Sequence, residues 1–172
     1  MIIGLSGYAR SGKDTVAGML IGLHGYDNRA FADGVRQFLV YLNPVLEDGH
    51  RVNEIVSEFG WEYAKARTEV RRLLQELGLG VRNFFGENCW VDRAMIGAKA
   101  GDKLVFTDVR FPNEAEMIKS LGGEIWRIQR PGIAPINNHP SESALDDWQF
   151  DKVILNSAGV EGLKQQIAAN FA

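Results

Sequence analysis

The first residues of the chain change from a continuous apolar pattern to a helical one. Residues 2–6 are apolar or small without a break, which is typical of a strand buried on both faces of a parallel sheet. From Asp14, apolar residues recur at the three- and four-residue spacing of a helix, and Gly25 favours a stop. The pattern therefore predicts a strand, a glycine-containing turn over residues 7–12 and a helix, in that order.

The same alternation of strand and helix patterns returns in the second half of the chain. Pro112 stands at the start of an apolar-periodic stretch, where proline favours the first turn of a helix. The further predicted elements are a weak strand over 29–31, a helix between Asp33 and Pro44, a strand over 103–108, a helix over 112–121, strands over 124–128 and 152–156, and a helix over 159–171. Strands that alternate with helices indicate an α/β fold, here with a parallel sheet of about five strands.

Two stretches interrupt the alternation. The middle of the chain shows almost no strand signal, and apolar residues from Val70 to Leu77 follow the spacing of an amphipathic helix. Residues 129–147 hold three of the five prolines and few apolar repeats, as expected of a surface loop or lid. We therefore expect one domain over residues 1–172, with a helical insertion over about 34–100 and a lid loop over about 129–147.

Composition narrows the class of protein. Of the 172 residues, 45% are hydrophobic and 24% charged, as in a globular protein, and no apolar run approaches the roughly 20 residues of a membrane span. The net charge of −3 disfavours a nucleic acid polymer as the main partner. The first residues lack the pattern of a secretory signal, so we expect a cytoplasmic protein. Cys89, the only cysteine, excludes an internal disulfide and a cysteine-based zinc site.

The strongest chemical signal is the segment GYARSGKDT over residues 7–15. It matches the phosphate-loop pattern GxxxxGK and lies between a predicted strand and a predicted helix, which is the context that this motif requires. Gly7 and Gly12 let the backbone curl so that amide hydrogens point at phosphates, and the start of the helix adds positive partial charge. Lys13 can then bridge the β- and γ-phosphates of a nucleotide.

Three oxygen-bearing residues are candidates for holding Mg²⁺. Asp14 replaces the Ser or Thr that usually follows the lysine, and Thr15 comes next, a spacing similar to the GKGT form of nucleoside monophosphate kinases. Asp108 ends an apolar strand pattern, from which a carboxylate can hold magnesium beside a phosphate loop. Alternatively, Asp108 caps the helix that follows.

Arginines near these motifs are candidates for neutralising phosphate charge. Arg10 lies within the loop itself, and Arg110 follows Asp108 by two residues, where its guanidinium could neutralise the transferring phosphoryl group. The alternative for Arg110 is a surface ion pair with Glu114.

The predicted helical insertion carries a possible second anion site. Arg71 and Gln75 lie four residues apart on one helical face, where arginine suits a phosphate and glutamine suits a nucleobase edge. A solvated face paired with Glu69 and Glu76 is an equal alternative. Trp90 either packs in a core or stacks on a base.

One further candidate lies just before this insertion. Asp33, in the loop after the second predicted strand, faces the same rim if the sheet is parallel. It could either receive a sugar hydroxyl or start a helix.

Together the motifs resemble the deoxynucleoside monophosphate kinase family of tailed bacteriophages, a branch of the P-loop kinases. The resemblance runs along nearly the whole chain and rests on the order and spacing of its parts. These are LSGYARSGKDT at 5–15, AFAD at 30–33, RRLLQELG at 71–78, GENCWV at 86–91, TDVRFPNEAE at 107–116, WRIQRPG at 126–132, HPSESALDD at 139–147 and FDKVILNSAG at 150–159.

The resemblance implies a P-loop NTPase fold of three α/β/α layers, a homodimer, and ATP with Mg²⁺ as cofactors. It implies that ATP is held by Gly7, Ser11, Gly12, Lys13, Asp14 and Thr15, with the adenine near Asn156 and Ser157. It also implies that a deoxynucleotide contacts Asp33, Arg71, Gln75 and Trp90. Arg127 or Arg130, with Glu142, is implied to lie in or beside the lid, where Arg127 would bind ATP and Arg130 and Glu142 the acceptor nucleotide.

The expected activity is in-line transfer of the γ-phosphate of ATP to a deoxynucleoside 5′-monophosphate. Phosphomevalonate and dephospho-coenzyme A kinases share the phosphate loop, so a kinase for another phosphorylated metabolite is the nearest alternative. A non-catalytic nucleotide-binding switch is less favoured, because the chain lacks the guanine-reading NKxD motif and its arginine-rich insertion suits a second anionic substrate.

Overall fold

In the computed structural model, which describes residues 1–135 and 140–171, a parallel sheet organises the larger of two structural units. This sheet unit consists of Met1–Ala30 and Met95–Ala172. Its five strands lie in the order β2-β3-β1-β4-β5 and all pair in parallel. Their bounds are β1 Ile3–Ser6, β2 Asp27–Arg29, β3 Leu104–Phe106, β4 Glu124–Gln129 and β5 Lys152–Leu155. The predicted α/β fold with about five parallel strands is confirmed.

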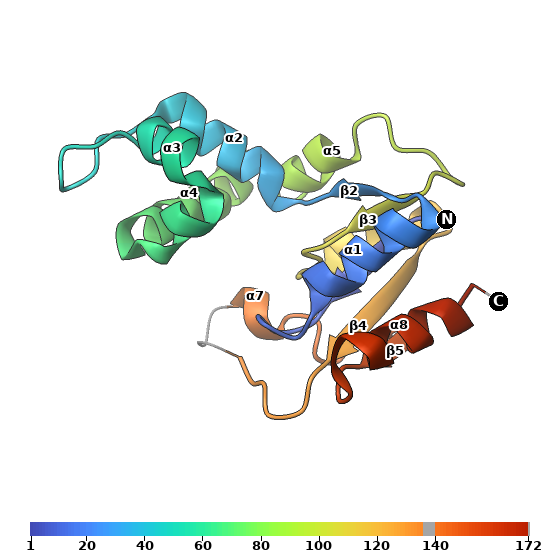
Figure 1. Ribbon diagram of the computed structural model, residues 1–172. Coiled ribbons are helices and arrows are strands. Elements are labelled where there is room, and N and C mark those ends of the chain that lie inside the picture. The colour runs from blue at the N-terminus through green and yellow to red at the C-terminus, as the bar shows by residue number, and fades with distance from the viewer. Residues whose placement is uncertain (136–139, 172) are drawn as a thin grey trace. The chain divides into compact units, whose positions relative to one another are not determined.

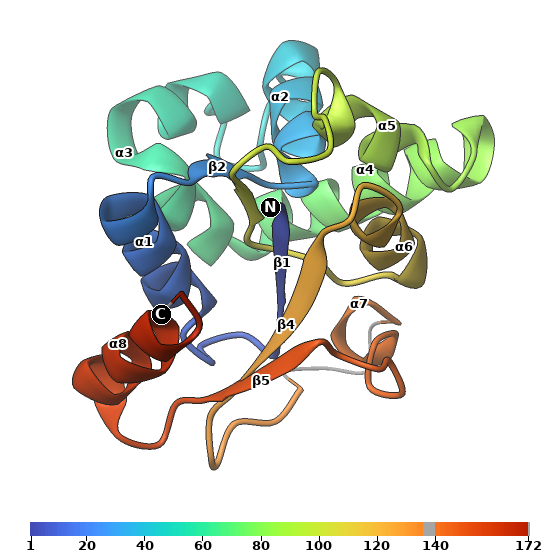
Figure 2. The ribbon, with the colours of Figure 1, turned by 90° about the vertical axis from the view of Figure 1, so that its right-hand side faces the viewer.

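Helices cover both faces of this sheet (Figure 2). On one face lie α1 (Lys13–His24) and α8 (Gly159–Ala169), whose Leu20 and Leu163 join Ile3 and Leu5 of β1 in one buried cluster. On the other face lies α6 (Pro112–Ser120), and the short α7 is Pro140–Ser143. Because the central strands are buried on both sides, their sequence is a continuous apolar run rather than an alternating one.

Gly4 shows how closely α6 approaches the sheet. A Cβ atom at this position would lie 2.8 Å from side-chain atoms of both Ile118 and Val109. The absence of a side chain in the middle of β1 therefore lets the helix pack directly on the strand that leads into the phosphate loop.

The second unit, Phe31–Ala94, is built from helices (Figure 1). They are α2 Ala32–Leu42, α3 Val52–Ala66, α4 Thr68–Phe85 and most of α5, Cys89–Met95. The core of this helical unit contains Leu39, Leu46, Val52, Ile55, Ala64 and Val70. In α3 the helical backbone is broken at Gly60, where φ is 78° and ψ is 171°. Among the described helices of the whole chain, none is both long and apolar enough to cross a membrane.

Several element bounds differ from the sequence prediction. The second strand is Asp27–Arg29 rather than 29–31, because its pairing with β3 begins at Asp27. The loop assigned to Asp33 is wrong, because α2 has already begun at Ala32. The lid predicted over 129–147 contains α7, but its residues 136–139 lie outside the described part of the chain.

Candidate active site

The phosphate loop joins β1 to α1 through three left-handed backbone positions. Gly7, Arg10 and Gly12 have φ angles of 139°, 65° and 110°. A Cβ atom at Gly7 would lie 2.4 Å from the carbonyl oxygen of Ile128, so this position requires glycine. Gly12 is the N-cap of α1 and has no side-chain oxygen to accept the first helical amides, which suits an anion at this helix start.

The side chain of Lys13, the first residue of α1, folds back onto the phosphate loop. Its Nζ donates to the carbonyl oxygens of Gly7 at 2.7 Å and Tyr8 at 2.9 Å. Burial, and after it the nearby Arg110 guanidinium, lower the pKa of Lys13 from 10.5 to about 8, while the carboxylates of Asp14, Glu142 and Asp108 oppose the shift. The ammonium group is thus the centre of a cluster of opposing charges.

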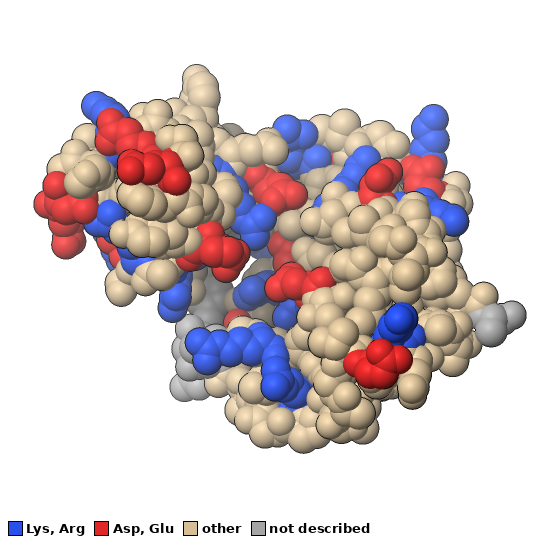
Figure 3. Space-filling view, in the orientation of Figure 1, with Lys and Arg blue, Asp and Glu red and all other residues tan. Residues whose placement is uncertain are grey.

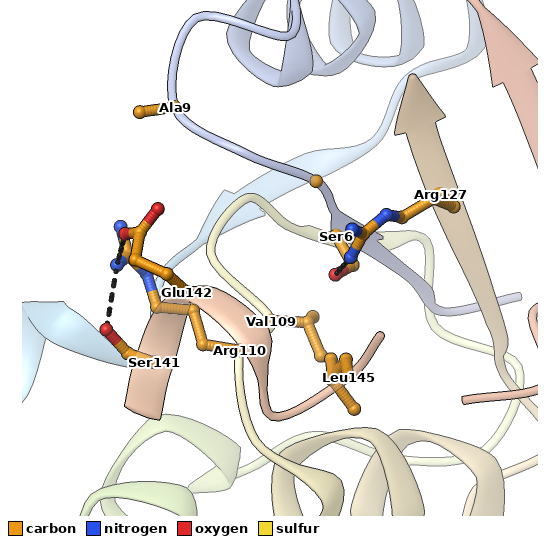
Figure 4. A pocket seen from close by; sticks show the side chains of 9 residues that line it. Ser6, Ala9, Val109, Arg110, Arg127, Ser141, Glu142 and Leu145 are labelled. Carbon is orange, nitrogen blue, oxygen red and sulfur yellow. Dashed lines mark hydrogen bonds and ion pairs between the residues drawn. The ribbon is translucent and has the colours of Figure 1, made fainter. Parts of the chain in front are cut away.

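Arg110 reaches across to the segment that contains α7. Its guanidinium lies 3.3 Å from Oε1 of Glu142 and 3.4 Å from the Ser141 hydroxyl, as Figure 4 shows. The side chain of Glu142 is only 12% exposed, whereas that of Arg110 is 46% exposed. In this pair the Glu142 carboxylate is nearly buried, whereas the Arg110 guanidinium is accessible to a ligand.

Two backbone amides at the start of α6 have their acceptor in Glu114. Phe111 is the N-cap of α6, and the buried carboxylate of Glu114 accepts the backbone amides of Arg110 at 2.7 Å and Phe111 at 3.0 Å. Asp108 lies two residues beyond the end of β3 and is half-buried.

A pocket lies between the phosphate loop and α7 (Figure 4). It contains about 300 Å³ of empty space, part of it open to solvent. Its lining comes from the loop, the segment after β3, β4 and the α7 segment, and consists of Ser6, Gly7, Ala9, Val109, Arg110, Arg127, Ser141, Glu142 and Leu145. Arginine, hydroxyl and loop backbone groups at one pocket are chemically suited to a phosphoryl group.

Arg127 lies beneath the phosphate loop and is 8% exposed. One guanidinium nitrogen donates to Oδ1 of Asp146 at 2.9 Å, and another lies 3.5 Å from the Ser6 hydroxyl. The same group lies over the rings of Tyr8 and Phe150, 4.7 Å and 5.4 Å from their centroids. The positive charge of Arg127 is therefore paired with a carboxylate and two aromatic rings of the protein itself.

Two other predicted nucleotide-binding residues contact the loop backbone. Arg130 donates to the carbonyl oxygen of Arg10 at 3.4 Å. Asn156, directly after β5, donates from Nδ2 to the carbonyl oxygen of Ser11 at 2.9 Å. Ser157 follows it and is exposed. The end of β5 and the segment after β4 thus both support the loop.

The magnesium candidates offer oxygen donors around Lys13. Asp14 and Thr15 are exposed in the first turn of α1, and Asp108 also acts on the Lys13 charge. The described residues contain no group of three or more His, Cys, Asp or Glu side chains placed to hold a metal alone. A hard cation held by one or two carboxylates together with nucleotide phosphates and water fits this donor set.

Two acceptor-site candidates lie on α4 of the helical unit. Arg71 is exposed and donates to the carbonyl oxygen of Lys65 at 3.0 Å, and Gln75 is exposed one turn later. Their neighbour Arg72 forms an exposed ion pair with Glu76 at 2.9 Å. For Arg72, the alternative of a solvent-exposed face paired with glutamates therefore holds.

The other two candidates, on α2 and α5, engage their own unit. The carboxylate of Asp33 pairs with Arg36 at 2.7 Å. Trp90 donates its indole N–H to the carbonyl oxygen of Gly78 at 2.9 Å, and its ring lies against Gly34, where a Cβ atom would approach within 2.9 Å. Trp90 is half-buried, so part of its ring surface remains accessible.

Sequence reasoning missed Tyr8 and Asp146. The Tyr8 hydroxyl donates to the Asp146 carboxylate at 3.0 Å, although 138 positions separate the two residues. The one available signal was Arg127, a charged residue inside an apolar strand pattern, because a buried charge requires a partner. On the face of the molecule shown in Figure 3, acidic and basic side chains are interspersed.

Comparison with known sequences gives three similarities. A sequence model of the family "Deoxynucleotide monophosphate kinase" matches residues 50–167. A protein of Acanthamoeba polyphaga mimivirus, provisionally named a deoxynucleotide monophosphate kinase, is 30% identical over 97% of this chain and 94% of its own. An uncharacterised protein of Ictalurid herpesvirus 1 is 34% identical over 57% of this chain and 46% of its own.

Among solved structures, the dephospho-CoA kinase of Campylobacter jejuni has a TM-score of 0.52 with 13% identity. The likeness covers 99% of this chain and 95% of that one. At this identity it supports the fold alone.

Proposed function

The chain belongs to the deoxynucleotide monophosphate kinase family, and from this premise we propose that it transfers the γ-phosphate of ATP to the 5′-phosphate of a deoxynucleoside monophosphate. Family membership makes the protein a nucleotide-binding phosphotransferase. The observation that carries the finer proposal is the charge cluster at the phosphate loop, where Lys13 and Arg110 lie among three carboxylates.

The reaction needs positioning and charge neutralisation rather than a covalent enzyme intermediate. An anionic oxygen of the acceptor phosphate attacks the γ-phosphorus, the bond from that phosphorus to the β–γ bridging oxygen breaks, and ADP leaves with that electron pair. Lys13 and Arg10 neutralise the donor phosphates, and Arg110 neutralises the transferring group from the side of the pocket. No strong base is required, because the acceptor oxygen is already ionised.

Mg²⁺ is the proposed metal, held by Asp108 and Asp14 with Thr15. When bound, it would neutralise charge on the nucleotide phosphates. The exposure of Asp14 and Thr15 in the first turn of α1 supports this assignment, because side chains at this helix start are accessible to a nucleotide.

The acceptor is proposed to bind the helical unit. Arg71 supplies a forked donor set for the 5′-phosphate, and Gln75 on the same helix supplies a paired donor and acceptor for the base. Trp90 offers its ring face rather than its indole N–H, because Gly78 accepts that hydrogen. Asp33 is the partner for the sugar hydroxyl, a bond that competes with its ion pair to Arg36.

The donor nucleotide is proposed to place its adenine near Ser157 and the backbone of Asn156, since the amide of Asn156 supports the loop. Glu142 acts by holding Arg110, and Arg130 adds positive charge at the rim of the loop. The motif resemblance also supports three further proposals: that the protein belongs to the bacteriophage branch of the family, that it is a homodimer, and that it acts in the host cytoplasm. Light scattering of the purified protein tests the dimer.

A kinase for another small phosphorylated metabolite is the second candidate, since the dephospho-CoA kinase likeness shows that this fold also occurs in an enzyme of that name. A coupled ADP-release assay with MgATP and each deoxynucleoside monophosphate separates the two, with phosphomevalonate and dephospho-coenzyme A as competing acceptors. Lys13→Ala is the test variant, and Lys164→Ala, which removes an exposed lysine of α8, is the matched control.

ADP release that requires a deoxynucleotide and Lys13, with Lys164→Ala active, supports the proposal. Release with another acceptor alone moves the assignment to that acceptor. ATP binding without release for any acceptor would favour a nucleotide-binding switch.

A further inference from the structure

We propose that Asp146 is a positioning residue that fixes the phosphate loop by joining Tyr8 of the loop to Arg127 of β4. The inference rests on the proposed function only in assuming that ATP is bound by this loop. Asp146 acts through Tyr8 and lies outside the groups assigned to phosphate chemistry.

The contacts of Asp146 meet at one carboxylate. The Tyr8 hydroxyl lies 3.0 Å from Oδ1 and 3.1 Å from Oδ2, and an Arg127 nitrogen lies 2.9 Å from Oδ1. Hydrogen bonds to an ionised acceptor are stronger than those between neutral groups. One side chain thus connects the residue after Gly7 with a residue in the sheet.

Arg127 makes this connection rigid. It is 8% exposed, and its Cα lies in register with Ser6, the last residue of β1. A guanidinium buried to this degree needs a compensating anion, and Asp146 is the carboxylate partner found for it within the described chain. The rings of Tyr8 and Phe150 lie over its guanidinium and restrict its position, while Asp146 itself remains partly exposed.

The connection reaches Lys13 through the backbone of Tyr8. The carbonyl oxygen of Tyr8 accepts hydrogen bonds from Lys13 Nζ at 2.9 Å and from the Ser11 amide at 3.2 Å. A Tyr8 ring held by Asp146 therefore fixes the peptide that orients Lys13. The pKa of Tyr8 is raised, by burial and then by its bond to Asp146, so the hydroxyl remains a donor through neutral pH.

Loss of this connection would leave the loop folded but less ordered, and ATP would then have to order it on binding. Asp146→Asn removes the charge that compensates Arg127, and Tyr8→Phe removes one hydroxyl while keeping the ring over the guanidinium. Asp147→Asn is the matched control, because it neutralises the adjacent, exposed carboxylate.

The experiment is calorimetric titration of the full chain with ATP, alongside its thermal unfolding midpoint. A hydrogen bond to a charged group is strong enough that Asp146→Asn and Tyr8→Phe should each raise the ATP Kd by about tenfold or more. The double variant should lose little more than the weaker-binding single variant, because both changes act on the same hydrogen bond between Tyr8 and Asp146. Asp147→Asn should bind as the unchanged protein does.

An unchanged ATP Kd in folded Tyr8→Phe overturns the inference, as does a lower unfolding midpoint with normal affinity in both variants, which would mean a role in stability alone. Additive losses in the double variant would also contradict it. Because the readout is ATP binding, it is independent of the acceptor. A protein that phosphorylates no deoxynucleotide would refute the proposed function and leave this test intact.

Discussion

Lys13 should give the enzyme an alkaline limb in its pH–rate profile. In the free protein the pKa of this ammonium group is lowered to about 8, chiefly by burial. Raising the pH from 7 to 9 therefore reduces its protonated fraction from about nine-tenths to about one-tenth, and kcat/KM for ATP should fall about tenfold. Phosphate groups titrate near pH 6, so the substrates stay in one ionisation state above pH 7.5 or so.

The neighbours of Lys13 predict how this limb moves. The Arg110 guanidinium lowers the pKa of Lys13, so Arg110→Gln should shift the limb to higher pH. The Glu142 carboxylate has the opposite effect, so Glu142→Gln should shift it to lower pH. Both variants lose activity, but the position of the limb reports the charge at Lys13 separately from the rate.

The assay is initial-rate ADP release at limiting ATP and saturating acceptor, from pH 6.5 to about 9.5, in buffers of constant ionic strength. Lys13→Arg keeps a positive charge across this range, so its profile should be flat on the alkaline side even though its rate is lower. A limb near pH 8 that persists in Lys13→Arg would assign the titration to another group and refute the reasoning.

Two further outcomes follow from the geometry, and a third follows from the proposed magnesium site. Gly7→Ala should lower the free energy of unfolding, measured in urea, by about 2–4 kcal/mol, because the new Cβ would lie 2.4 Å from the Ile128 carbonyl oxygen at a φ of 139°. The control Gly18→Ala has open space around it in α1 and should stabilise the protein by about 0.5–1 kcal/mol, so equal effects of the two changes would contradict this reasoning. Glu114→Ala leaves two amides at the start of α6 without their acceptor and should lower the free energy of unfolding by about 2 kcal/mol. Glu114→Gln keeps an acceptor oxygen and should lose less stability, so equal losses in the two variants would argue against an acceptor role. Chelation by EDTA should reduce ADP release to background and excess MgCl₂ should restore it, whereas release that persists in EDTA would exclude the metal requirement.

The β1–loop–α1 segment was predictable because its signals are local. A continuous apolar run gives way to glycines and then to helical spacing, and each change is visible within a few residues. The second strand was harder, since Asp27–Arg29 is a polar edge strand that exists because β3 supplies its pairing partner. Local propensity does not contain that information.

The connections within the site could be predicted only in part. The motif identified Lys13, but the contact between Tyr8 and Asp146 depends on how distant segments fold together. Helical spacing brought Arg71 and Gln75 to one face from sequence alone, because a helix fixes the positions of residues four apart. What those two side chains bind remains a prediction.

The pairing of β2 with β3 has a further consequence for how this enzyme can diversify. The two strands are parallel neighbours, so the chain between them forms a crossover, for which about a dozen residues suffice. Here that crossover runs over residues 30–103 and includes the whole helical unit. Most of its length is therefore surplus to the topology of the sheet. Under the proposed binding of the acceptor to the helical unit, exchange of this crossover would change the choice of acceptor while leaving β1, β4 and the loop unaltered, so selectivity could be engineered as a separable module.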